Sequence, residues 1–118
     1  MNPILFHIPH ASAVIPERYR ADFLPCLEEN LLRLTDRYTD ELFDFGLGDR
    51  LVFPVSRLVC DPERFREDGR EDMAKIGMGA VYTAGYDLRP LRRSLTAEER
   101  EEILRTYYDP HHKTLEKR

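Results

Sequence analysis

The chain has 118 residues, of which 42% are hydrophobic, 22 are acidic and 18 are basic, giving a net charge of −4 at pH 7. This length allows one domain with a core and is too short for two ordinary domains. The charges are interspersed without a basic stripe, which argues against a nucleic-acid partner. No apolar run approaches membrane-spanning length and no signal-peptide pattern opens the chain, so we expect a cytoplasmic protein without a membrane partner.

Short apolar runs predict the strands. Residues 4–8 and 51–53 are typical of strands buried on both faces, and residues 57–60 fit a third strand or a continuation of the second. A short strand is also expected over 81–83. The charged, glycine-containing stretch 62–80 shows poor periodicity and predicts a long loop.

Helical spacing of apolar residues predicts the helices. A helix is expected over 18–34 with a boundary or kink at Pro25, and a shorter one over about 42–45. The clearest helix runs over 96–115, where a capping box marks the start and a proline introduces a kink. Strands alternating with helices indicate an α/β fold, with a mixed or mostly parallel sheet flanked by helices.

Three residues are candidates for metal binding or acid–base chemistry. His10 follows the first predicted strand, at the strand end where ligand sites of α/β sheets lie. Asp36 and Asp40 share one face of a helix through their i, i+4 spacing, and carboxylates bind zinc or act as general bases. Each also has an ordinary interpretation, with His10 as a surface or capping residue and the acids as a helix cap and a solvated first-turn residue.

A charged segment follows the second strand. Arg57 and Asp61 would share one face of an extended strand, and Arg64 comes shortly after. A guanidinium group matches a carboxylate in planar, bidentate fashion, so the segment could hold an acidic substrate. The alternative is a structural salt bridge at a strand end.

Adjacent histidines lie near the end of the chain. Helical spacing places His111 on the same side as the core residues Leu104, Tyr108 and Leu115, with His112 about 100° further round. The two do not share a face, so they would not chelate one metal. His111 fits either a catalytic group or a satisfied core histidine.

The order of these segments resembles the N-formylglutamate amidohydrolase family. That family shows Pro-His-Ser-Gly and Ile-Pro after the first strand, then Thr-Asp with Asp-Glu-Leu, then Ser-Arg-x-Val-x-Asp-x-x-Arg, a stretch with Gly and Tyr, and Tyr-Tyr-x-Pro-x-His. The matching segments here are 9–16, 35–42, 56–64, 77–82 and 107–112.

The resemblance implies a zinc-dependent hydrolase with a fold similar to zinc exopeptidases. Such an enzyme would cleave the C–N amide bond of a small N-formyl or N-acyl amino acid with a zinc-activated water. By analogy, His10 and Asp36 would be metal ligands, and Asp40 a catalytic residue that supports them or replaces one as ligand. The same analogy places the protein in histidine degradation.

The resemblance also implies a substrate site. Arg57 and Arg64 would hold the carboxylates of a small acidic N-acyl amino acid, and Asp61 would orient Arg57. His111 would be a catalytic polar group in the active site.

The chain departs from the family pattern in two places and in length. Ala11-Ser12 stands where the family has Ser-Gly, and Glu63 stands where it usually has Asn. Family members are longer, and a third zinc ligand would be expected after Arg118, so the chain resembles an incomplete single domain over residues 1–118. A second hypothesis is therefore a truncated, inactive member that serves as a binding or oligomerisation domain, for which an open sheet edge would favour a homodimer.

Overall fold

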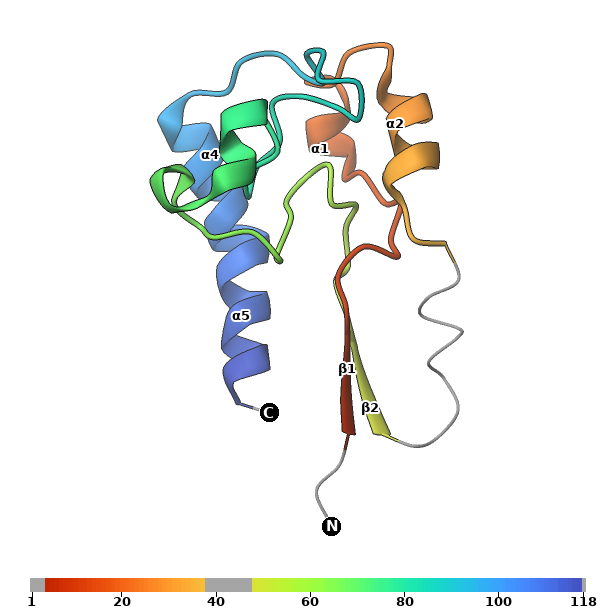
Figure 1. Ribbon diagram of the computed structural model, residues 1–118, viewed down its shortest axis with the longest axis vertical. Coiled ribbons are helices and arrows are strands. Elements are labelled where there is room, and N and C mark those ends of the chain that lie inside the picture. The colour runs from red at the N-terminus through yellow and green to blue at the C-terminus, as the bar shows by residue number, and fades with distance from the viewer. Residues whose placement is uncertain (1–3, 38–47, 118) are drawn as a thin grey trace.

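The computed structural model describes residues 4–37 and 48–117 and shows a mixed α/β protein (Figure 1). Two strands and a set of helices make up the regular structure. In chain order the strands and α-helices are β1 (Ile4–Ile8), α1 (Glu17–Arg20), α2 (Leu27–Leu34), β2 (Gly48–Val52), α4 (Ala97–Ile103) and α5 (Asp109–Glu116). Short 3₁₀ helices cover Asp68–Arg70 and Asp72–Ile76, and a π-helical segment, Leu104–Tyr108, joins α4 to α5.

The two strands form a parallel sheet, in the direction that the sequence predicted for most of the sheet. Ile4 pairs with Gly48 and Ile8 with Val52, and the amide of Phe53 then donates to the carbonyl of Ile8 over 3.0 Å. Because the strands are parallel, their carboxyl ends meet at the same edge. The segments that leave this edge, 9–12 and 53–61, carry His10, Arg57 and Asp61 of the candidate site.

The hydrophobic core lies beyond the carboxyl ends of the strands, where the connecting segments meet α2 and α4 (Figure 1). Its members come from the segments 53–60 and 78–91, from α1, α2 and α4, and from the π-helical segment, with Ile15 before α1. The largest fully buried apolar side chains are Tyr82, Phe53, Leu58, Leu91, Ile103 and Leu104. The candidate site therefore borders the hydrophobic core.

A long helical rod runs from α4 through the π segment to α5. The predicted capping box is confirmed, since Thr96 accepts from the Glu99 amide and the Glu99 side chain accepts from the Thr96 amide. Pro110 has no amide hydrogen and would clash with a carbonyl one turn earlier in an unbroken α-helix. The wider π turn precedes it at Leu104–Tyr108. No helix in the described part of the chain is both long and apolar enough to cross a membrane.

Two predicted strands are wrong. Residues 57–60 form turns instead, because the Ser56 hydroxyl accepts from the Leu58 amide at 3.1 Å and the Ser56 carbonyl accepts from the Val59 amide at 2.9 Å. Residues 81–83 are irregular, and the Gly77 carbonyl takes the amide of Thr83 at 2.8 Å. Apolar composition here reflects burial in the core rather than a place in the sheet.

The predicted helix over 18–34 is two helices, α1 and α2, separated by the segment that contains Pro25. Phe23 in that segment makes an isolated bridge to Arg92, which draws the backbone out of helical geometry. The second strand begins earlier than predicted, at Gly48, and ends at Val52. The short helix expected over 42–45 lies outside the described residues.

Candidate functional site

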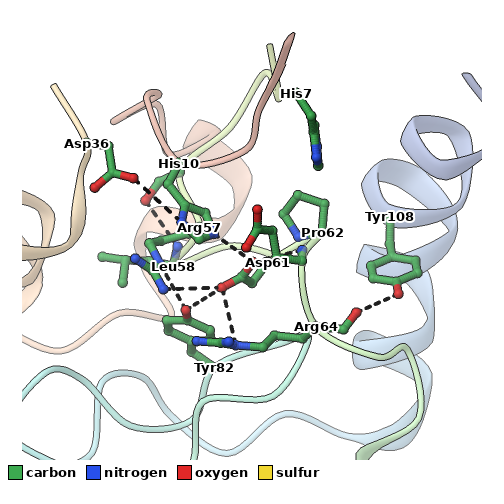
Figure 2. A network of polar contacts seen from close by, with 12 residues as sticks. His7, His10, Asp36, Arg57, Leu58, Asp61, Pro62, Arg64, Tyr82 and Tyr108 are labelled. Atoms are coloured by element: carbon green, nitrogen blue, oxygen red, sulfur yellow. Dashed lines mark hydrogen bonds and ion pairs between the residues drawn. The ribbon is translucent and has the colours of Figure 1, made fainter. Parts of the chain in front are cut away.

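The carboxylate of Asp61 is the centre of a buried polar network (Figure 2). The side chain is 0% exposed. Its Oδ1 accepts a hydrogen bond from the Glu63 amide at 3.0 Å and lies 2.8 Å from His10 Nε2. Its Oδ2 accepts from the Tyr82 hydroxyl at 2.5 Å. The segment 53–61 thus places one buried acid between His10 on one side and Tyr82 on the other.

The ionised state of Asp61 follows from these bonds. Burial by itself would raise the pKa of the carboxyl, but hydrogen bonds from His10, Tyr82 and the Glu63 amide favour the charged form and hold the pKa below its usual value. An ionised carboxylate only accepts hydrogen bonds, so His10 Nε2 must carry the proton that lies between them.

The second ring nitrogen of His10 faces another acid. Its Nδ1 lies 3.8 Å from Oδ2 of Asp36, and the amide of Asp36 donates to the carbonyl of His10 over 2.8 Å. His10 is buried, whereas the side chain of Asp36 is 58% exposed. The imidazole therefore links the buried acid on one side to an acid at the protein surface on the other.

Two arginines flank the same carboxylate. Arg57 Nη2 lies 3.5 Å from Asp61 Oδ2, and Arg64 Nε lies 3.6 Å from the same oxygen. Arg57 Nε also donates to the Tyr82 hydroxyl at 2.9 Å. One buried carboxylate thus faces two guanidinium groups, and a guanidinium group matches the planar shape of a carboxylate.

A second histidine pair joins β1 to α5. Nε2 of His7 and Nε2 of His111 are 2.8 Å apart, and the ring centroids are 5.0 Å apart. These distances place the rings end to end, the geometry of one shared hydrogen bond. Burial lowers the pKa of His7, and it lowers the pKa of His111 to about 4, with further lowering from the neighbouring histidines. The pair is neutral near pH 7.

The other terminal histidine contacts the segment that carries Asp61. His112 Nε2 lies 2.7 Å from the carbonyl of Pro62, and its ring stacks on Tyr108 with centroids 4.2 Å apart. The Tyr108 hydroxyl donates to the carbonyl of Arg64 over 2.6 Å. The π-helical segment and α5 therefore hold the backbone of residues 62–64 in place.

The structure brings most of the sequence-predicted site residues together. His10, Asp36, Arg57, Asp61 and Arg64 form one contiguous network. Asp61 lies beside Arg57, at a turn rather than along a strand face, and it also contacts His10.

His111 is not part of this network. His111 contacts His7 and the edge of Phe53, on the side of the rod that faces the core. Asp40 lies outside the described residues.

The donor set fits part of a metal site. With Nε2–H given to Asp61, the Nδ1 lone pair of His10 is available on the side of Asp36, and a carboxylate that holds one imidazole nitrogen while the other binds metal is a common arrangement. Two ligands of a tetrahedral zinc ion lie roughly 3.4 Å apart, close to the 3.8 Å between Nδ1 and Oδ2. Across residues 4–37 and 48–117, no group of three or more His, Cys, Asp or Glu is placed to hold a metal ion.

Two residues with polar contacts are not among the sequence-predicted site residues. Tyr82 lies in a predicted strand and in the Gly- and Tyr-containing stretch of the family pattern, but these features predict no role for its hydroxyl. His7 lies in the first predicted strand, and its partner in the structure, His111, is 104 positions away in sequence. Local patterns carry no signal for such a distant pairing.

The fold and the network define an α/β protein whose site combines a carboxylate-bound histidine with two arginines. A family model described as N-formylglutamate amidohydrolase matches residues 2–118. The chain belongs to the N-formylglutamate amidohydrolase family, which suggests a function of amidohydrolase type. Searches of curated proteins and of solved structures each gave no significant match.

Proposed function

We propose that the chain acts in hydrolysis of the C–N amide bond of a small N-formyl or N-acyl amino acid with an acidic group, and that it uses zinc. The observation that carries this proposal is the contact of His10 with both Asp61 and Asp36, beside two arginines. Membership of the family supports the reaction class.

Each residue of the network has a role in this proposal. His10 Nδ1 and Asp36 would hold the metal, and Asp61 keeps the His10 ring in place through Nε2. The metal, when bound, would supply an acidified water and polarise the amide carbonyl. Arg57 and Arg64 would bind the substrate carboxylate, because their guanidinium groups approach Asp61 only at 3.5 and 3.6 Å and match a carboxylate in bidentate fashion. Asp40, as a residue that supports or replaces a metal ligand, and His111, as a catalytic polar group, stay predictions.

The test combines metal analysis with an activity assay on the purified protein. The zinc-loaded protein should release formate from N-formyl-L-glutamate, and a chelator should abolish release. His10→Ala should lose both zinc and activity. Arg57→Gln should raise KM, because it removes one of the two guanidinium groups that would bind the substrate carboxylate.

A matched control and two contrary outcomes complete the experiment. Arg33→Gln alters an exposed ion pair with Glu29 on α2 and should leave KM and zinc content as in the unmodified protein. Full activity of His10→Ala would refute the proposal. Binding of N-formyl-L-glutamate without formate release from the zinc-loaded protein would replace it with a carboxylate-binding function.

A further inference from the structure

The hydroxyl of Tyr82 lies between Asp61 and Arg57 (Figure 2). The side chain is 0% exposed, and its hydroxyl both donates to Asp61 Oδ2 and accepts from Arg57 Nε. Burial and the neighbouring Asp61 raise the pKa of the phenol, so the hydroxyl keeps its proton. Its single hydrogen is therefore committed to Asp61, and Arg57 uses an oxygen lone pair.

The two oxygens of Asp61 have different partners. Oδ1 serves His10 and the Glu63 amide, and Oδ2 serves Tyr82. The two arginines approach Oδ2 only at 3.5 and 3.6 Å, distances at which neither makes a strong hydrogen bond. The short bond from Tyr82 is thus the strongest restraint on Oδ2 and fixes the plane of the carboxylate.

The same hydroxyl restrains Arg57. Because Nε of Arg57 is bonded to Tyr82, the guanidinium group cannot turn that edge toward Asp61. Without the hydroxyl, both arginines could close on the carboxylate and form bidentate pairs with it, a geometry that guanidinium groups favour. A carboxylate drawn toward the arginines would hold His10 Nε2 less tightly.

We propose that Tyr82 is a positioning residue that acts through Asp61 to hold His10 in the tautomer with its proton on Nε2 and its Nδ1 lone pair toward Asp36. The inference rests on the proposed function, because that tautomer is the one in which Nδ1 can bind a metal. Tyr82 itself touches neither metal nor substrate in this scheme. A phenylalanine ring at this position would fill the same space in the core but would leave Asp61, and through it the tautomer of His10, less restrained.

The test compares Tyr82→Phe with Tyr19→Phe. Both substitutions remove one buried hydroxyl, but that of Tyr19 makes no hydrogen bond with any described residue, so it controls for loss of a buried oxygen. The tautomer of His10 is measured in metal-free protein by ¹⁵N NMR of the imidazole rings, with the signal assigned by its loss in His10→Gln. Zinc affinity is measured separately by competition with a chromogenic chelator.

The unmodified protein and Tyr19→Phe should show the Nε2–H tautomer and equal zinc affinity. Tyr82→Phe should show a mixture of tautomers and bind zinc about 10–100-fold more weakly, the usual effect of losing a residue that orients a ligand. Retention of the Nε2–H tautomer and of full zinc affinity in Tyr82→Phe would overturn the inference.

Two further results separate this inference from the proposed function. Failure of the unmodified protein to bind zinc would refute the metal proposal, while the tautomer comparison would still decide the role of Tyr82. Where Tyr82→Phe does not fold, the unmodified protein provides the measurement. The Tyr82 hydroxyl proton should give a slowly exchanging downfield resonance that is lost in Asp61→Asn, and its absence in the unmodified protein would overturn the inference.

Discussion

Replacing Asp61 by asparagine should be among the most damaging single changes in the protein. The substitution keeps the size of the side chain but removes its charge, leaving Arg57 and Arg64 without their shared carboxylate. The new amide group also presents hydrogens to at least one of the donors, His10 or Tyr82. Breaking a buried ion pair by removing one partner costs about 3–5 kcal/mol, and we expect a loss of free energy of unfolding in that range.

The loss should depend on pH. The pKa of Asp61 is lower in the folded protein than in the unfolded chain, so its stabilising contribution is complete above the unfolded value of about 4 and is lost as pH falls through the folded value. The difference between the unmodified protein and Asp61→Asn should therefore be constant from about pH 5 to neutrality and shrink at lower pH. Urea unfolding followed by circular dichroism at several pH values measures it.

Asp72→Asn is the matched control. The Asp72 side chain is 99% exposed and faces only Lys75 at 3.8 Å, so its substitution should change stability by less than about 0.5 kcal/mol. A similarly small change for Asp61→Asn, or a difference that stays constant down to pH 3, would refute the account of Asp61 as a buried, charged centre.

Three backbone positions give further predictions, each measured by urea unfolding. Leu88→Gly should raise stability by about 0.5–1 kcal/mol, because Leu88 has φ 66° and is exposed; an unchanged midpoint would argue against strain there. Gly85→Ala should lower stability by about 1–3 kcal/mol, since a Cβ would lie 2.3 Å from Oδ1 of Asn30, which is held by the Tyr86 amide; a neutral effect would mean that Asn30 can move. Thr96→Ala should cost about 1 kcal/mol through loss of the helix cap, and serine at this position should restore most of it.

The parts of the fold that sequence predicted well are those determined by local chemistry. The capping box at Thr96 satisfies backbone groups within one turn and was predictable from four residues. The failed strand at 57–60 shows the opposite case. Its apolar residues are buried because distant segments pack on them, while the Ser56 hydroxyl turns the backbone locally. The apolar composition of residues 57–60 indicates burial but cannot distinguish a strand from a buried turn.

The candidate site shows the same contrast between features set by local sequence and features set by distant contacts. The sequence indicates His10 because it follows a buried strand. It indicates Arg57 and Asp61 because they would share one face of an extended strand, although they lie on a turn in the structure. The contact between His10 and Asp61 was not predicted, because it depends on how a turn 51 positions later folds back. Tyr82 was missed for a related reason: its hydroxyl has a partner only after the core has assembled.

The π-helical segment Leu104–Tyr108 makes the rod sensitive to insertions and deletions. Loss of one residue from this segment would allow a regular α-helix and would rotate everything after it by about 100°. His111 would then turn away from Phe53 and His7, and His112 from the carbonyl of Pro62. Substitutions within the segment change single contacts, but a change in its length would separate both histidines from their partners in one step. The spacing between the capping box and the histidines is therefore under tighter constraint than the identity of most residues between them.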